Sequence, residues 1–330
     1  MTFHSSATGI FQIKSYGDSV KQKTVFYKSS AAACALFVLG YAVMVFPTKT
    51  ADEYTFLGFL VSAVCGIGLC IAFIPIANAL IRETSGGVFI KIVKALVFLI
   101  LAVAALHTAA DAFSDFSDFS SEVILPDTAK AVITAVFGFA VIFFALKRQE
   151  DTLKFALIGF VFTAVAAVFF FFAMSENYNV SNIYISRLPD FGEFKNAVKP
   201  YFIKVTLPAL LLPFYRGLVF GNKRSTACFT GTAIGYILLG LCILSPVMLF
   251  GTQLAGKLSY PYASAVSTVS VGKLFTRMDG FSYFIYFIAA ITKINICIFI
   301  AVSALKKIRN LMNKKATAYG SYSKGQYNKT

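Results

Sequence analysis

The chain has few charged residues and no tryptophan. The low content of charged residues already limits the class of protein to which it can belong. Of 330 residues only 14% are Asp, Glu, Lys or Arg, whereas about a quarter are charged in soluble proteins. Hydrophobic residues make up 58%, with a mean hydropathy of +0.73. Because the apolar residues are spread along the whole chain, this composition excludes a soluble globule, a disordered chain and a soluble domain on a single anchor.

Histidine and paired cysteine are also scarce, which argues against metal and hydrolytic chemistry. There are two histidines, His4 and His107, and neither a GxSxG nor an HExxH pattern occurs. All six cysteines lie inside apolar runs, and none forms a CxxC pair. We therefore expect no metal site, no cofactor and no enzymatic activity.

The sequence instead contains long runs of apolar residues. A run of about 18 residues is long enough to cross the hydrocarbon core of a bilayer as a helix. These runs are continuously hydrophobic and do not alternate as the strands of a membrane barrel do. The sequence therefore predicts an all-α polytopic membrane protein with about eight transmembrane helices, at residues 28–46, 56–81, 88–110, 128–146, 153–174, 198–220, 227–250 and 281–305.

The basic residues are distributed unevenly between the two sides of these spans. Alternate connections and both tails hold 20 of the 30 Lys and Arg residues, and the remainder of the chain holds 10. By the positive-inside rule, both termini are cytoplasmic and residues 111–127 are external. This explains the net charge of +15 without a nucleic-acid partner. We expect a basic cytoplasmic tail (1–27), a transmembrane domain (28–305) and a second basic cytoplasmic tail (306–330) against anionic membrane lipid.

Two predicted spans contain residues that interrupt helices. The sixth carries Pro200, Pro208 and Pro213, and the first ends "LGYAVMVFP". Interrupted spans at corresponding positions of two oppositely oriented repeats indicate a transporter-type ligand site at the bilayer midplane. The alternative for each span is a simple kink or close helix packing. The predicted site lies beside Gly40, Tyr41 and Ala42 and beside the stretch from Thr206 through Pro208 to Pro213.

Lys293 lies near the centre of the last span, too deep for its ammonium to reach water easily. With Thr292 and Asn295, we expect it to face the ligand cavity. A structural lysine bonded to the carbonyls of a broken helix is an equally weighted alternative. His107 and Asp111, four residues apart, form either a proton relay or, as the favoured alternative, a hydrogen-bonded pair at the membrane boundary. The GxxxG pair of Gly231 and Gly235 indicates helix packing.

The last third of the chain resembles the spore germination permeases, the B subunits of nutrient germinant receptors. The resemblance rests on Tyr260 and Pro261, on Ser270 and Gly272, on Phe275, Arg277 and Asp279, and on Lys293 in "AAITKINICIF". More diffusely, "LGYAVMVFP" and "LPALLLPFYRG" resemble the first and sixth spans of that family, with Ala42 replacing its second glycine.

The resemblance implies a leucine-transporter-like fold of the amino acid, polyamine and organocation superfamily, with inverted repeats and broken helices 1 and 6. The family has ten spans, so the second repeat here is expected to be shortened. The implied function is a germinant-receptor subunit that binds a small nutrient such as an amino acid and contacts other receptor subunits, in the spore inner membrane or the bacterial cell membrane. The alternatives are a proton- or cation-coupled amino acid transporter and a membrane scaffold that does not bind a ligand.

Overall fold

The computed structural model describes residues 28–40, 54–81, 88–147, 149–183, 187–220, 225–269 and 279–326, and all the regular structure in these ranges is helical. Six of the described helices are long and apolar enough to cross a membrane, and two shorter apolar helices accompany them. The chain is therefore an all-α polytopic membrane protein. Its helices are the N-terminal helix Lys28–Leu39, α2 (Thr55–Ile81), α3 (Val88–Phe119), α4 (Lys130–Ala145), α5 (Gln149–Ala173), α6 (Phe191–Tyr201), α7 (Leu207–Ala209), α8 (Leu211–Phe220), α9 (Ser225–Ala255), α10 (Pro261–Ser267) and α11 (Asp279–Gln326).

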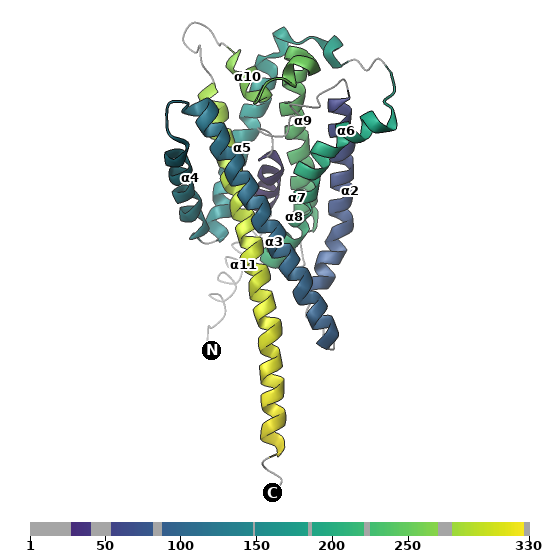
Figure 1. Ribbon diagram of the computed structural model, residues 1–330, viewed down its shortest axis with the longest axis vertical. Helices are drawn as coiled ribbons and strands as arrows, with labels where there is room; N and C mark the ends of the chain where they lie inside the picture. The colour runs from purple at the N-terminus through teal and green to yellow at the C-terminus, as the bar shows by residue number, and fades with distance from the viewer. Residues whose placement is uncertain are drawn as a thin grey trace, which may run out of the picture.

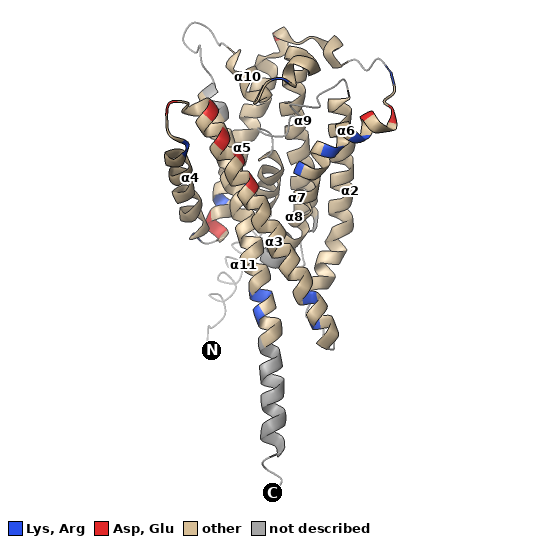
Figure 2. Cartoon of the chain, viewed as in Figure 1, with Lys and Arg blue, Asp and Glu red and all other residues tan. Residues whose placement is uncertain are grey.

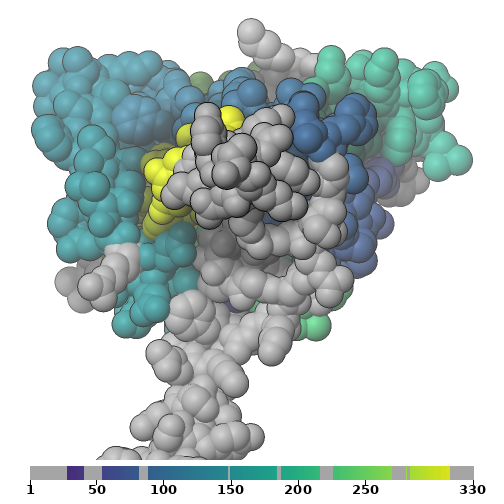
Figure 3. Space-filling model, turned by 90° about the horizontal axis from the view of Figure 1, so that it is seen from below, coloured from purple at the N-terminus to yellow at the C-terminus, as the bar shows by residue number. Residues whose placement is uncertain are grey.

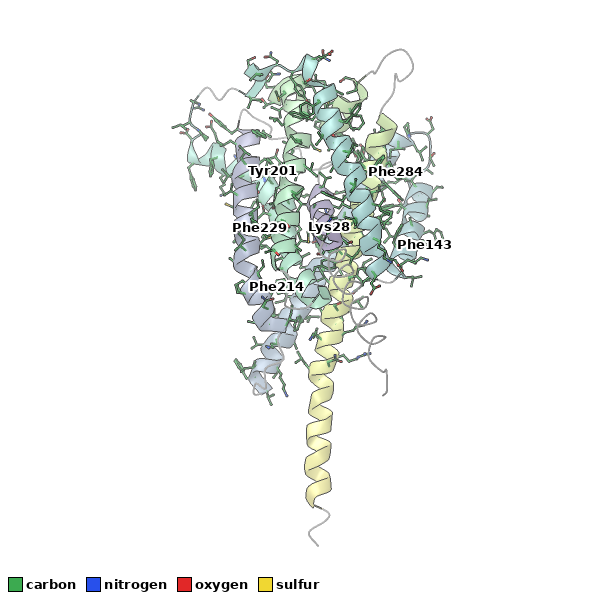
Figure 4. The ribbon with its side chains drawn as sticks, turned by 180° about the vertical axis from the view of Figure 1, so that it is seen from behind. Lys28, Phe143, Tyr201, Phe214, Phe229 and Phe284 are labelled. Carbon is green, nitrogen blue, oxygen red and sulfur yellow. The ribbon has the colours of Figure 1, made fainter. Side chains whose placement is uncertain are left out.

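The N-terminal helix occupies the centre of the bundle. Its residues from Ala32 to Leu39 are all buried, and Figure 4 shows the helix that begins at Lys28 enclosed by the others. Helix α9 approaches it closely, because an added Cβ on Gly231 would lie 2.2 Å from the Ala31 carbonyl oxygen and one on Gly235 would lie 2.8 Å from that of Ala35. The GxxxG pair is thus a helix-packing motif, as the sequence predicts.

The other helices surround this central helix. Helix α11 packs along α3, which crosses it obliquely, and also contacts α4, α5 and α8 (Figure 1). On the other side α2 contacts α6, α8 and α9. Figure 3, seen from below, shows the teal of α4 and α5 on one side of α11 and the blue of α3 and α2 on the other. A short α10 lies across the upper end of α9 and α11 in Figure 1.

The outer faces of the peripheral helices are apolar. Ile100 on α3, Phe139 on α4 and Ile158 on α5 are all more than half exposed, together with many other large hydrophobic side chains. In water such a continuous apolar surface would be unfavourable, but it suits contact with lipid chains.

Each of the eight predicted spans overlaps a described helix, but the helices in the first and fourth predicted spans, Lys28–Leu39 and Lys130–Ala145, are shorter than the six that are long enough to cross a membrane. Residues 41–46 of the first predicted span lie outside the described residues. Helix α4 has 16 residues, about 24 Å at 1.5 Å per residue, less than the hydrocarbon core of about 30 Å. Helix α3 does not end near residue 110 but continues to Phe119, through most of the predicted external connection, because it remains packed on α11. Helix α11 likewise continues from the last span through residues 306–326.

Candidate functional site

The predicted sixth span is interrupted, but by a change of helix type and not by an unwound gap. Helix α6 ends at Tyr201, a π-helical turn covers Phe202–Thr206, and α7 and α8 follow with a tight turn at Leu210. The Leu207 N–H reaches back five residues to the Phe202 carbonyl. Because proline has no N–H to donate, Pro208 and Pro213 each remove an ordinary helix bond in this stretch.

One carbonyl freed by these prolines is bonded by another helix. Pro213 lies four residues after Ala209 and cannot donate to its carbonyl oxygen. The Cys70 thiol of α2 donates to that oxygen instead, with a sulfur–oxygen distance of 3.5 Å. This contact satisfies a polar group that would otherwise lie exposed within the membrane.

Thr206 is fully buried in a hydroxyl network between three helices. Its hydroxyl donates to the Ser62 carbonyl at 3.0 Å, and it lies 2.9 Å from the Ser62 hydroxyl and 3.3 Å from the Tyr236 hydroxyl. Gly66 leaves the space for Tyr236, because an added Cβ would lie 2.2 Å from the tyrosine oxygen. Thr206 therefore joins span six to α2 and α9, and its hydroxyl is already engaged by protein groups.

Gly40 and Lys293, two of the residues predicted to form the ligand site, lie close together. Lys293 is 1% exposed, and an added Cβ on Gly40 would lie 3.1 Å from the lysine Cδ. The lysine side chain thus passes directly beside the end of the N-terminal helix. Tyr41 and Ala42 lie outside the described residues.

Thr292 and Asn295 are also buried beside Lys293 on α11. The Asn295 amide donates to the Ile291 carbonyl of its own helix at 2.9 Å. Within the described part of the chain, the Thr292 hydroxyl and the Asn295 side-chain oxygen have no hydrogen-bond partner. Lys293, Thr292 and Asn295 therefore form a polar region inside the last span, at a depth where polar groups are expensive.

A cleft lined by polar and apolar side chains lies between α3 and the interrupted span. Its volume is about 340 Å³, within the range of small-molecule sites. Helix α3 contributes His107, Thr108, Asp111 and Asp115 from one face, and span six contributes Lys204, Ile203, Leu207, Pro208 and Leu211. Figure 2 shows the acidic residues of α3 and the basic residues of the neighbouring span.

The charges of the cleft interact with one another. The His107 Nδ1 lies 3.1 Å from a carboxylate oxygen of Asp111, which agrees with the predicted hydrogen-bonded pair. Asp115 is partly buried and lies within charge–charge range of both Lys204 and Lys293. The cleft thus presents two carboxylates and a lysine, of which Asp115 is partly buried and Asp111 and Lys204 are exposed. Within the described ranges, no three side chains are grouped as a metal site would require.

The predicted residues of span six do not all face this cleft. Pro208 lines it, whereas Thr206 and Pro213 do not. The reason is helical periodicity, since residues 204, 207, 208 and 211 share one face and Thr206 points from the other toward α2. Asp115 and Lys204 were not predicted as site residues. Asp115 could have been found from its position four residues after Asp111 on the same helical face.

The residues that carry the family resemblance are only partly described. Pro261 begins α10, where a proline without an N–H is well tolerated, and Asp279 begins α11. Gly272, Phe275 and Arg277 lie outside the described residues.

Comparison with known proteins does not assign the chain. No protein-family model matches it, and no curated protein is significantly similar to it.

Proposed function

We propose that this protein is a permease-like membrane subunit that binds a small zwitterionic nutrient, such as an amino acid, in the cleft between α3 and span six. The supporting observation is that Asp111, Asp115 and Lys204 line one cleft. The carboxylates suit a ligand ammonium group, and the lysine suits a ligand carboxylate. Leu207 and Leu211 form an apolar wall that suits contact with an uncharged side chain of the ligand.

The position of the cleft fits a ligand that arrives from outside the cell. Asp111 lies 17 residues after Lys94, or about 25 Å along the helix at 1.5 Å per residue. If Lys94 marks the inner boundary, as the charge distribution indicates, the cleft occupies the outer part of the membrane. Deeper in the bundle, the side chain of Lys293 lies beside Gly40 at the end of the N-terminal helix.

Ligand screening of the detergent-purified protein tests this proposal. Amino acids should raise the melting temperature, because a ligand that binds only the folded state stabilises it. Sugars and nucleosides lack the paired ammonium and carboxylate and serve as the comparison set. If no amino acid raises the melting temperature, or if sugars raise it equally, the proposed ligand class is wrong.

Coupled transport is a second candidate, favoured by the burial of Lys293 inside the last span. Uptake of a stabilising amino acid into proteoliposomes, driven by a proton or cation gradient, would separate a transporter from a receptor subunit. In the receptor form, the protein binds its ligand and signals through other germinant-receptor subunits in the spore inner membrane or the bacterial cell membrane. A scaffold that has lost ligand binding would show neither stabilisation nor uptake.

A further inference from the structure

Helix α4 is short, and a lysine lies at each of its ends. Its 16 residues span about 24 Å at 1.5 Å per residue. Lys130 in its first turn forms an ion pair with Asp118 of α3. Lys147 follows its last turn, and the lysine Nζ lies 4.5 Å from the centre of the Phe143 ring. Because both ammonium groups are engaged beside the helix ends, they limit the apolar stretch of α4 to about its helical length.

One end of α4 does not reach the level at which α3 becomes basic. The ion pair places the first turn of α4 beside Asp118, and Asp118 lies 24 residues after Lys94, about 36 Å along α3. Helix α4 runs back over only about 24 Å. The tilt of α3 reduces this difference, but Figure 1 shows α4 ending well above the lower end of α3. Helix α4 therefore ends at a depth where α3 is still apolar.

Charged residues gather at this end of α4. The exposed ones are Lys147, Glu150, Asp151 and Lys154. Figure 2 shows charged residues at the lower ends of α4 and α5, higher in the view than the basic residues of α3 and α11. Because a charge inside the hydrocarbon core is costly, lipid headgroups and water have to reach this turn. A bilayer accommodates a helix that is shorter than its hydrocarbon core by becoming thinner around it.

The outer face of α4 is apolar and open to lipid. Val136 is 65% exposed, Phe139 74% and Phe143 56%, and their spacings of three and four residues place them on one side of the helix. Helix α2, on the other side of the bundle (Figure 1), has 27 residues and spans about 40 Å. Lipids beside α2 therefore meet a long helix, whereas lipids beside α4 meet a short one.

We propose that α4 thins the bilayer beside it and prefers phospholipids with short acyl chains. The lipid is recognised by the length of its chains, and the headgroup does not enter the argument. The proposal does not depend on the function of the nutrient cleft, nor on which side of the membrane is cytoplasmic.

The absence of tryptophan from the chain allows each face to be probed separately. Phe139→Trp places the only tryptophan on the exposed face of α4, and Ile71→Trp places it on α2, where Ile71 is 50% exposed. Each full-length variant is reconstituted in brominated dioleoyl phosphatidylcholine mixed with unbrominated phosphatidylcholine of shorter, equal or longer chains. Bromine quenches tryptophan fluorescence on contact, so the competition reports the relative affinity of each chain length at each helix.

A longer α4 provides a second test. Insertion of Leu-Ala-Leu-Leu between Leu146 and Lys147 in the Phe139→Trp variant adds about one apolar turn to the helix. Insertion of Gly-Ser-Gly-Ser at the same place is the matched control, because it adds the same number of residues without apolar length. Melting temperatures identify any variant that fails to fold.

We expect Phe139→Trp to favour short chains over long chains by about twofold or more relative to Ile71→Trp. The apolar insertion should remove most of this preference, and the polar insertion should leave it unchanged. The same chain-length dependence at both tryptophans, or an unchanged dependence after the apolar insertion, would overturn the proposal. If the apolar insertion does not fold, the comparison of the two tryptophans decides alone; if Phe139→Trp does not fold, Val136→Trp on the same face replaces it.

Discussion

The close approach of α9 to the N-terminal helix can be tested at Gly231. Replacing this glycine by alanine places a Cβ 2.2 Å from the Ala31 carbonyl oxygen, a distance at which one of the two backbones must shift. Gly68 on α2 provides a matched control, because an added Cβ there has no neighbouring atom within 4 Å. Both glycines lie inside helices of comparable length.

The expected difference between the two variants follows from packing and helix propensity. Overpacking costs about 1–3 kcal/mol, so Gly231→Ala should be destabilised. Gly68→Ala should gain about 0.5–1 kcal/mol, because alanine favours the helical state over glycine. Their free energies of unfolding should therefore differ by about 1.5–4 kcal/mol, which corresponds to about 3 °C or more in melting temperature.

The cysteines of the protein supply a convenient assay. Five of the six are buried and only Cys65 is exposed, so a thiol-reactive fluorescent dye reports unfolding in detergent. Replacing Cys65 by serine in both variants removes the background signal. If Gly231→Ala melts at the same temperature as Gly68→Ala, α9 does not approach the central helix as closely as the structure shows, and the packing role of the GxxxG pair fails.

Three further substitutions test the polar contacts inside the bundle by melting temperature. Thr206→Val should lower stability by about 1–2 kcal/mol, because it deprives two buried hydroxyls of a partner, whereas Thr206→Ser should retain most of it; equal loss in both would contradict the hydroxyl network. Cys70→Ala should destabilise by about 1 kcal/mol through the exposed carbonyl of Ala209, and Cys70→Ser should restore the bond; no difference between them would mean that the thiol does not bond that carbonyl. Lys293→Ala should cost about 2–5 kcal/mol by opening a cavity beside Gly40, while Lys293→Met should keep or raise the melting temperature because it fills the space without a buried charge; a Met variant as unstable as the Ala variant would show that the charge itself is required for folding.

The positions of the helices could be predicted from the sequence because crossing a membrane requires long apolar runs. The role of Gly231 and Gly235 was also predictable, since small residues four apart on one helix face allow a second backbone to approach. The interruption of span six was predictable from its three prolines, which cannot donate backbone hydrogen bonds.

The hydrogen bonds that stabilise the interrupted span were not predictable. The partners of Thr206 and Ala209 come from α2 and α9, and their choice depends on which helices become neighbours. The central place of the N-terminal helix likewise depends on the packing of the whole bundle, because its sequence is as apolar as the spans that face lipid.

Asp115 was missed for a different reason. Hydropathy placed the end of the third span near residue 110, but backbone hydrogen bonding continues the helix to Phe119. A carboxylate assigned to an external connection thus lies on the same helical face as His107 and Asp111. The inverted repeat, the shortened second repeat and the contribution of Tyr41 and Ala42 to a midplane site stay predictions.

The central claim is that the charges of the cleft recognise the two ends of a zwitterion. The most direct test is equilibrium binding of a stabilising amino acid, its deaminated analogue and its decarboxylated analogue to the unchanged protein, Asp115→Asn and Lys204→Gln, with Glu176→Gln on an exposed helical turn as the control. We predict that Asp115→Asn weakens binding of the two ligands that carry an ammonium group, that Lys204→Gln weakens binding of the two that carry a carboxylate, and that Glu176→Gln changes neither. If all four proteins bind the three ligands with the same affinities, the cleft is not the ligand site.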